Sequence, residues 1–260
     1  MSNPVFFVPA GSLDGLVAGS TATVTGPEGR HAATVRRLGP GEPVDLVDGR
    51  GTRARGRVSR AEGDVLAVVL DGVDREPKPP YRLVLVQALA KGDRDELAAE
   101  AATELGADVV VPWQAERSIV RWKGERGAKS LAKWRALVAA AAKQSRRAWV
   151  PDVDEAHDGG ELTARVGRAA LAIVLHEDAT APLGALLDEF TAQGAPTDGE
   201  VLFIVGPEGG ISPAEIERFT AAGARLALLA PHVLRSSTAG PAALAIAGDR
   251  LGRWPARSAS

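Results

Sequence analysis

Cysteine is absent from this sequence of 260 residues, which excludes disulfide bonds and thiol chemistry. No apolar run approaches the roughly 18 residues that a membrane-spanning helix needs. The four histidines are not paired at the spacing of a zinc site, so we expect no metal. The first residues lack a basic segment followed by a long apolar one, and no secretory signal is predicted. These absences together favour a soluble, cytoplasmic protein.

The net charge of -2 gives no overall attraction to nucleic acid, but two segments are locally basic. The first runs from Gly49 to Arg60 and contains five arginines and no acid. Within it, Arg53, Arg55 and Arg57 occupy alternate positions, which would place them on one face of a strand. This pattern is compatible with a phosphate-binding face and equally with an ordinary solvated face.

The second basic segment, from Arg117 to Trp149, has ten lysines or arginines against one acid, Glu125. Trp122, Trp134 and Trp149 are interleaved with these basic residues. Such a mixture suits phosphate contacts combined with stacking on bases. The alternative is a solvated face whose tryptophans pack inward.

The chain divides at a polar, proline-rich segment, residues 74–80, which can continue neither a helix nor a central strand. Before this linker, short β-like runs are separated by turn signals and interrupted by one helix, over residues 31–38. Residues 1–73 are therefore predicted to form a small β-barrel. Its expected strands are residues 5–8, 21–25, 44–47 and 65–70.

After the linker, strands alternate with helices, which indicates a mostly parallel α/β sheet in residues 81–260. A helix over residues 93–105 has acids in its first turn and Gly106 where a C-terminal cap belongs. A second helix is predicted from Ser212 to about Gly223, because Ser212 and Glu215 can form a capping box around Pro213. The expected strands are residues 83–89, 109–111, 171–175, 201–205 and 226–229, with a further helix over 129–146 and a loop over 152–160.

Two unusual strings follow the last two of these strands, and the carboxyl ends of buried parallel strands are where ligands bind. The first, GPEGG at residues 206–210, has glycines that permit close approach of a ligand to the backbone. It lacks the lysine of a phosphate-binding loop, and Glu208 would repel a phosphate. A cationic or neutral ligand fits better, and S-adenosylmethionine, with its sulfonium and ammonium groups, is one. A plain tight turn is the alternative.

The second string, LAPHVLRSSTAG at residues 229–240, joins a strand to an alanine-rich helix that contains residues 242–247. Its serines and threonine can cap this helix. Arg235 has no acidic residue nearby in the sequence, so it is free to pair with Glu208, to meet a negative substrate, or to remain an ordinary surface arginine. Together the two strings predict one cofactor pocket.

The order of these strings, GPEGG before a capped helix and then LxPxxLRxxTA before a helix of small residues, resembles the SPOUT-class RNA methyltransferases. The resemblance is strongest to the RsmE family, which methylates N3 of a uridine in 16S ribosomal RNA. Shorter motifs agree in order and approximate spacing, so the resemblance extends over nearly the whole chain. They include KGDR at residues 91–94, TELG at 103–106 and QSRR at 144–147, and, in the first domain, His31 with VRRL at 35–38 and DGRG at 48–51.

This resemblance implies a PUA-like RNA-binding β-barrel in residues 1–73 and a SPOUT methyltransferase domain in residues 81–260, whose parallel sheet ends in a deep trefoil knot. It also implies a homodimer that uses S-adenosylmethionine, needs no metal and acts on 16S ribosomal RNA in the small ribosomal subunit. The target would be the uridine conventionally numbered 1498. The alternatives are a SPOUT methyltransferase with another RNA target and a catalytically inactive protein that binds RNA or the ribosome.

Methylation at N3 requires loss of a proton, and our hypothesis is that Arg235 lies beside the uracil and stabilises the developing negative charge. Glu208 is a candidate general base, and the alternatives are that it faces the S-adenosylmethionine cation or pairs with Arg235. Ser237 stands where the family often has glutamate, and Asn3 lies where it often has a nearby arginine, so neither family feature is expected here. The expected cofactor-binding residues are Leu175, His176, Glu177, Val205, Gly206, Pro207, Glu208, Gly209, Gly210, Leu229, Leu234, Arg235, Ser236, Thr238 and Ala239. The expected RNA-binding residues are His31, Arg36, Arg37, Arg53, Arg55, Arg57, Arg117, Arg121, Arg146 and Arg147.

Overall fold

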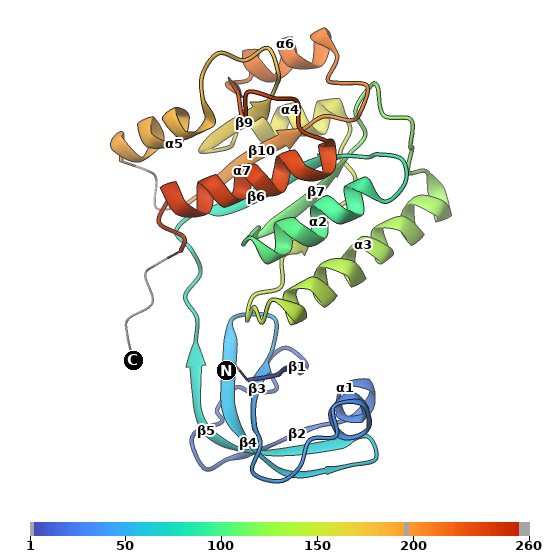
Figure 1. Ribbon diagram of the computed structural model, residues 1–260, viewed down its shortest axis with the longest axis vertical. Helices are drawn as coiled ribbons and strands as arrows, with labels where there is room; N and C mark the ends of the chain where they lie inside the picture. Colours follow the sequence, from blue (N-terminus) through green and yellow to red (C-terminus); the bar gives the residue numbers. More distant parts are fainter. Residues whose placement is uncertain (1–2, 195–197, 255–260) are drawn as a thin grey trace. The chain divides into compact units, whose positions relative to one another are not determined.

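The computed structural model describes residues 3–194 and 198–254, and the chain divides into two compact units (Figure 1). The first unit comprises Met1–Lys78 and Ala142–Val150, and the second comprises Pro79–Ala141 and Pro151–Ser260. Within the first unit, Ala142–Val150 is joined to the N-terminal residues through two backbone hydrogen bonds, which the amides of residues 51 and 150 donate to the carbonyls of residues 148 and 49.

The first unit is built on a five-stranded sheet in the order β1-β3-β4-β5-β2, in which only the β1–β3 pair is parallel. Alternate side chains of β4 point into one core, where Ala54 and Val58 are buried opposite the exposed Arg55 and Arg57. The strand β5 continues beyond the predicted end at residue 70, into the segment expected to be irregular. The strands are β1 (Val5–Phe7), β2 (Thr21–Val24), β3 (Pro43–Val47), β4 (Thr52–Glu62) and β5 (Val65–Arg75).

The helix predicted over residues 31–38 is wrong in its start and its type. Helix α1 (Gly26–Arg30) begins earlier, with Pro27 in its first turn, where a missing N–H costs nothing. It continues directly into the π-helix η1 (His31–Val35). A Cβ atom at Gly29 would lie 2.0 Å from the carbonyl oxygen of Asp64, so glycine is what allows α1 to pack against the turn between β4 and β5.

The second unit contains a six-stranded sheet in the order β11-β9-β10-β6-β7-β8, and every pair in it is parallel. The predicted parallel α/β sheet is therefore confirmed. The loop predicted over residues 152–160 also contains β8 and the first turn of a helix. The strands are β6 (Arg82–Ala88), β7 (Val109–Trp113), β8 (Asp152–Val153), β9 (Leu171–Leu175), β10 (Glu200–Val205) and β11 (Arg225–Ala227).

Helices cover both faces of this sheet, which explains why its strands are apolar throughout (Figure 1). In β6, Leu83 and Leu85 face one apolar core, whereas Val84 and Val86 face the other. The helices packed in the first core are α2 (Arg94–Glu104), α5 (Leu183–Ala192) and α7 (Ser236–Arg250), and those in the second are α4 (Gly159–Val166) and α6 (Pro213–Ala221). A long helix, α3 (Gly124–Gln144), follows β7.

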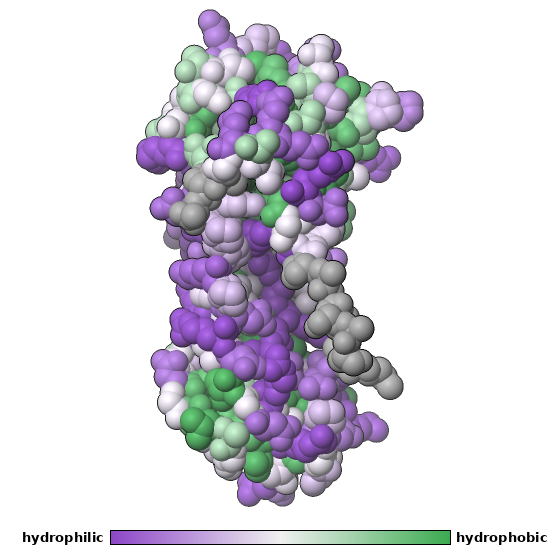
Figure 2. All heavy atoms as spheres, turned by 90° about the vertical axis from the view of Figure 1, so that its left-hand side faces the viewer, coloured by the Kyte–Doolittle hydropathy of each residue, from purple (hydrophilic) through white to green (hydrophobic). Residues whose placement is uncertain are grey.

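Three of the predicted helix boundaries depend on specific residues, and all three are confirmed. Ser212 and Glu215 form the predicted capping box at the start of α6. Gly106 and Gly223 follow α2 and α6 with φ angles of 99° and 104°, the left-handed conformation that glycine adopts most readily. None of the described helices is both long and apolar enough to cross a membrane. Hydrophilic residues predominate on the face drawn in Figure 2.

Candidate functional site

The carboxyl ends of β9, β10 and β11 lie at one edge of the sheet, because these three strands are parallel neighbours. The segments after β9 and at the end of β11 are joined by backbone hydrogen bonds. The amide of His176 donates to the carbonyl of Ala227 at 3.1 Å, and that of Leu228 donates to Ala181 at 2.8 Å. The structure thus brings the three predicted cofactor-binding strings to one edge, the usual place for a ligand in a parallel sheet.

Helix α7 is held close to the sheet by Gly240. A Cβ atom there would lie 2.5 Å from a methyl carbon of Leu85 in β6 and 3.4 Å from one of Val205 in β10. Only a residue without a side chain permits this approach. The close contact brings the start of α7, with Ser236 and Thr238, to the end of the strand that GPEGG follows.

The backbone amides and carbonyls of the LAPHVL segment, which leads into α7, are available for hydrogen bonds to a ligand. Among the described residues, 229–234 form no backbone–backbone hydrogen bond. Contrary to prediction, no side chain caps α7, and the Oγ atom of Ser236 is buried without a hydrogen-bond partner in the described part of the chain. Buried hydroxyl groups normally have a partner, so these unused groups fit a small polar ligand that provides one.

The GPEGG string forms a tight turn, as its composition indicates. The amide of Gly210 donates to the carbonyl of Pro207 at 2.9 Å, and Gly210 has a φ angle of 72°. A Cβ atom at Gly206 would lie 2.7 Å from Cγ1 of Ile211, which explains the glycine at the start of the turn. Arg117 donates to the carbonyl of Gly209 at 3.1 Å and so links this turn to the loop after β7.

Glu208, the acid of this turn, pairs with Arg94 at 2.8 Å. The predicted alternative in which Glu208 pairs with Arg235 is therefore wrong: the partner comes from the first turn of α2, about a hundred residues earlier. Arg235 itself is exposed and makes no ion pair with any described residue. The edge therefore combines a neutralised carboxylate with a free cation, a combination that favours a negatively charged substrate.

Two further carboxyl groups help to shape this edge. Glu116, after β7, accepts hydrogen bonds from Ser212 at 2.6 Å and Arg218 at 2.9 Å, and these interactions lower its pKa. They connect the β7 loop with the start of α6. Asp95, next to Arg94, is buried and accepts the amide of Ala90, and burial raises its pKa.

The predicted basic strand face is formed, but its charge is neutralised by acids of neighbouring strands and of the segment after β5. Arg53, Arg55 and Arg57 lie on one face of β4, as predicted. Arg53 pairs with Asp45 of β3 and with Glu76. Arg55 and Arg57 pair with acids of β5, at residues 74 and 71. The absence of acids near these arginines in the sequence therefore did not indicate a free positive charge.

The tryptophans of the second basic segment provide no open stacking platform at Trp134. This side chain is only 1% exposed and packs edge-on against Trp122 at 5.3 Å. Base stacking on Trp134 is therefore excluded, and the alternative of an inward-packed tryptophan is confirmed for this residue. Arg117 and Arg121 of the same segment donate to backbone carbonyls of residues 209 and 116.

The remaining predicted RNA-binding residues belong to the first unit. Arg36 and Arg37 are exposed, and His31 is half-buried. Arg146 has a φ angle of 59°, and its carbonyl accepts a hydrogen bond from Arg53. Arg147 already interacts with another group of the protein, so it is not a free cation. No group of three His, Asp or Glu residues in the described part of the chain is placed to hold a metal ion.

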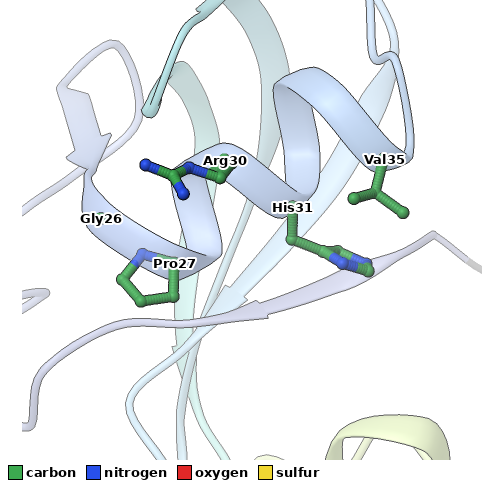
Figure 3. A pocket seen from close by; sticks show the side chains of 5 residues that line it. All are labelled: Gly26, Pro27, Arg30, His31 and Val35. Carbon is green, nitrogen blue, oxygen red and sulfur yellow. The ribbon is translucent and has the colours of Figure 1, made fainter.

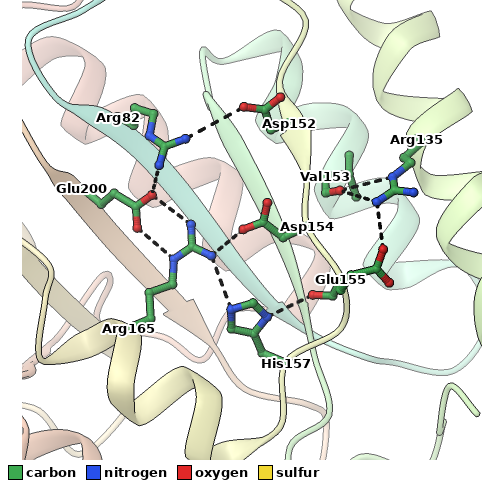
Figure 4. A network of polar contacts seen from close by, with 9 residues as sticks. All are labelled: Arg82, Arg135, Asp152, Val153, Asp154, Glu155, His157, Arg165 and Glu200. Carbon is green, nitrogen blue, oxygen red and sulfur yellow. Dashed lines mark hydrogen bonds and ion pairs between the residues drawn. The ribbon is translucent and has the colours of Figure 1, made fainter.

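A dense ionic network lies at the opposite, amino edge of the sheet (Figure 4). Arg165, at 11% side-chain exposure, pairs with Glu200 at 2.8 Å and with Asp154 at 2.5 Å. Arg82 also pairs with Glu200. The same arginine pairs with Asp152, so two arginines face three acids, and the network joins α4, β6 and β10 without offering a free cation.

Known proteins match both parts of the chain. Residues 77–248 match the RNA methyltransferase domain family, and residues 24–71 match the RNA methyltransferase PUA domain family. The ribosomal RNA small subunit methyltransferase E of Mycobacterium bovis is 46% identical over 245 residues, covering 92% of this chain and 90% of the relative. The protein of the same name from Bacillus subtilis is 29% identical over 220 residues, covering 84% and 86%.

A solved structure agrees with these sequence matches. It is the ribosomal RNA small subunit methyltransferase E of Neisseria gonorrhoeae bound to S-adenosylmethionine, with a TM-score of 0.78 at 27% identity. The match covers 95% of this chain and 98% of that one. A fold similar to that of this chain is therefore found in a methyltransferase that binds S-adenosylmethionine.

Proposed function

The chain belongs to the ribosomal RNA small subunit methyltransferase E family, and from this we propose that it methylates N3 of a uridine in 16S ribosomal RNA with S-adenosylmethionine as the methyl donor. The proposed target is the uridine numbered 1498, in the small ribosomal subunit. Such a substrate places the protein in the cytoplasm. The S-adenosylmethionine bound to the relative from Neisseria gonorrhoeae supports the choice of cofactor.

The cofactor would be held at the carboxyl edge of β9, β10 and β11. When bound, S-adenosylmethionine supplies an electrophilic methyl group on a positively charged sulfur. The peptide groups of residues 229–234 form no backbone–backbone hydrogen bond with any described residue, so they can bind the polar edge of the adenine. The buried hydroxyl of Ser236 also has no hydrogen-bond partner among the described residues, and a bound ligand could provide one. The remaining proposed contacts come from Leu175–Glu177, Val205–Gly210 and Leu229–Ala239 at the positions predicted from the sequence.

The unpaired cation of Arg235 is the observation that carries the proposed chemistry. N3 of neutral uracil bears a proton, which must leave before or during methylation, and negative charge then develops on the base. An exposed guanidinium with no ion-pair partner among the described residues can stabilise this charge without first breaking another contact. Glu208 remains the candidate proton acceptor, although its ion pair with Arg94 would have to open.

We also propose a homodimer formed through the second unit. Four large apolar side chains among the described residues of this unit are exposed, Leu97 at 56%, Ile119 at 79%, Val233 at 76% and Trp254 at 49%. Val233 belongs to the proposed cofactor segment and Ile119 follows the loop that contacts GPEGG. Sedimentation equilibrium tests this proposal, since a mass that stays at 27.0 kDa at all concentrations would contradict a dimer.

A deep trefoil knot is proposed for the last part of the second unit. Strand β11 lies at the edge of the sheet beside β9, whereas the next element, α7, packs on β6 and β10 further inside. The connection must therefore pass back across the ends of β9 and β10. Knots are rare, so the family resemblance is an essential part of this proposal. A crystal structure in which the path of the chain is unknotted would contradict this proposal.

Methylation is tested with small ribosomal subunits that lack the modification, incubated with the protein and methyl-labelled S-adenosylmethionine. Mass spectrometry of the nucleosides should then detect labelled 3-methyluridine. A different labelled nucleoside would indicate another RNA target. If cofactor and subunits bind but no methylated nucleoside forms, the chain is a binding protein and not a methyltransferase.

A further inference from the structure

Two sets of arginines in the first unit differ in their partners. Those of β4 pair with acids of β4 or of neighbouring segments, as Arg53 does with Asp45. Arg30, Arg36 and Arg37, on and directly after α1 and η1, make no ion pair with any described residue. Three unpaired cations of this unit therefore lie close together along the chain on its helical side, where the sequence already predicted RNA contacts at His31, Arg36 and Arg37.

A hollow of about 340 Å³ lies on the same helical side (Figure 3). Its lining comprises Gly26, Pro27, Arg30, His31 and Val35. In Figure 3 the His31 ring lies between Pro27 and Val35, and Arg30 lies on the preceding turn. Val35 is 66% exposed, an unusual position for a large apolar side chain beside three arginines. The hollow thus presents flat and apolar groups together with the Arg30 cation, and Arg36 and Arg37 directly follow Val35 in the chain.

The helical turns that line this hollow are fixed from behind. Glu28 of α1 accepts a hydrogen bond from the amide of Phe7 at 3.1 Å and pairs with Lys143 at 2.7 Å. Ala32, on the inner side of η1, is fully buried. These contacts leave the outward-facing side chains on a rigid support, which reduces the entropy lost when a ligand binds.

The backbone here also departs from ordinary helix geometry. The amide of Arg36 donates to the carbonyl of His31 at 2.8 Å, a π-type hydrogen bond that spans five residues. Arg37 follows with a φ angle of 53°, in the left-handed region that arginine rarely adopts. Single π-turns and strained residues occur frequently at functional sites. Together they turn two arginines away from a regular helix immediately after Val35.

Resting on the proposed function, we propose that this hollow binds one unstacked base of the ribosomal RNA, outside the site of methyl transfer. The base stacks on the His31 ring, with Pro27 and Val35 as its apolar surroundings. Arg30, Arg36 and Arg37 contact the phosphates on either side of it. Single-stranded RNA is recognised by this combination of a flat side chain under a base and cations along the backbone.

The test compares two exposed valines of the same unit in the full-length protein. Val35→Asp places a negative charge in the hollow, and Val17→Asp is the matched control, because Val17 is 63% exposed and does not line the hollow. The probe is a fluorescent single-stranded RNA of about ten nucleotides covering the proposed target. Loss of one stacked base lowers affinity roughly 5- to 150-fold. We expect a loss of this order for Val35→Asp and for His31→Ala, and none for Val17→Asp.

A second series uses the same oligonucleotide with one base at a time removed. Wild-type protein should bind one of these abasic RNAs more weakly, and that base should no longer matter to His31→Ala. Equal affinities of Val35→Asp and Val17→Asp, or an equal base dependence in wild type and His31→Ala, would overturn the proposal. Normal oligonucleotide binding with loss of binding to intact subunits would also overturn it, since the hollow would then contact a ribosomal protein.

Methyl transfer to small subunits is measured on the same protein preparations, so that the two proposals fail separately. Base-dependent binding at His31 without methyl transfer would retain the hollow and reject the proposed function. Methyl transfer by the wild type, together with no effect of Val35→Asp on RNA binding, would retain the proposed function and reject the hollow as an RNA-binding site. Binding of S-adenosylmethionine should be equal in all variants, which confirms that the second unit is folded in each.

Discussion

Arg94 donates a hydrogen bond to Glu208 across 2.8 Å and thereby joins the first turn of α2 to the GPEGG turn after β10. Both side chains are partly exposed, at 48% and 34%, so their ion pair contributes less than about 1 kcal/mol to stability. Its main effect is to fix the position of the GPEGG turn. With Arg117 bound to the carbonyl of Gly209, two arginines hold consecutive residues of the proposed cofactor loop.

We therefore expect Arg94→Ala to weaken S-adenosylmethionine binding about fivefold to tenfold, because the loop must be ordered when the ligand binds. The free energy of unfolding should fall by less than about 1 kcal/mol. Calorimetric titration of Arg94→Ala, Glu208→Ala and the double variant measures the coupling between the two residues. Independent, additive losses in the double variant would show that the ion pair does not position the loop.

Replacement of Arg235 by alanine should depress turnover much more than cofactor affinity. Removing one group that stabilises developing negative charge typically lowers kcat by about 100-fold or more. Arg235→Lys retains a positive charge and should recover part of the loss, whereas its less extended donor group should leave it below wild type. Turnover is measured with saturating small subunits and cofactor. An unchanged rate for Arg235→Ala would rule out the proposed role.

The parallel sheet could be predicted from sequence because its strands are buried on both faces. Leu202 and Phe203 of β10 face opposite cores, and such unbroken apolar runs allow few other interpretations. The capping box at Ser212 is equally local. Strand β8, in contrast, is two residues long and exists through its pairing with β7, so it has no pattern of its own. Helix α5 begins after Pro182 without a side-chain cap and was not predicted either.

The site was predictable as a set of loops but not as a set of contacts. Strand order brings the two glycine- and serine-containing strings to one edge, and parallel strands made this expectable. The partner of Glu208 could not be deduced, because Arg94 precedes it by more than a hundred residues. The neutralisation of the basic strand β4 could not be deduced either, because Arg53 pairs with Asp45, which belongs to a different strand.

Glu116 makes the stability of the second unit depend on pH. Hydrogen bonds from Ser212 and Arg218 lower its pKa in the folded protein below the ordinary value of 4.5. Its contribution to stability is therefore present above that value and is lost as the pH falls through the lower folded pKa. Glu116→Gln should unfold at lower urea concentrations than wild type at neutral pH, and the difference should vanish in acid. Glu217→Gln, which changes an exposed residue of α6, should show no such dependence.

Gly29→Ala should destabilise the first unit, because the new methyl group would meet the backbone carbonyl of Asp64 at 2.0 Å. A backbone atom cannot swing aside as a side chain can, so we expect a loss of about 1 to 3 kcal/mol and displacement of α1. Gly39→Ala is the matched control: a Cβ atom there has nothing within 4 Å, and its φ angle lies outside the left-handed region. That substitution should leave stability unchanged or raise it by up to about 1 kcal/mol.

Hydrogen exchange followed by mass spectrometry is the suitable measurement, since two compact units need not unfold together. For Gly29→Ala, faster exchange should be confined to α1, η1 and the sheet behind them, while peptides of β6 and β10 keep the protection of the wild type. RNA binding at His31 should weaken in parallel, since the same packing contact supports the hollow. Equal protection of α1 in Gly29→Ala and Gly39→Ala would mean that the contact with Asp64 does not hold this helix in place.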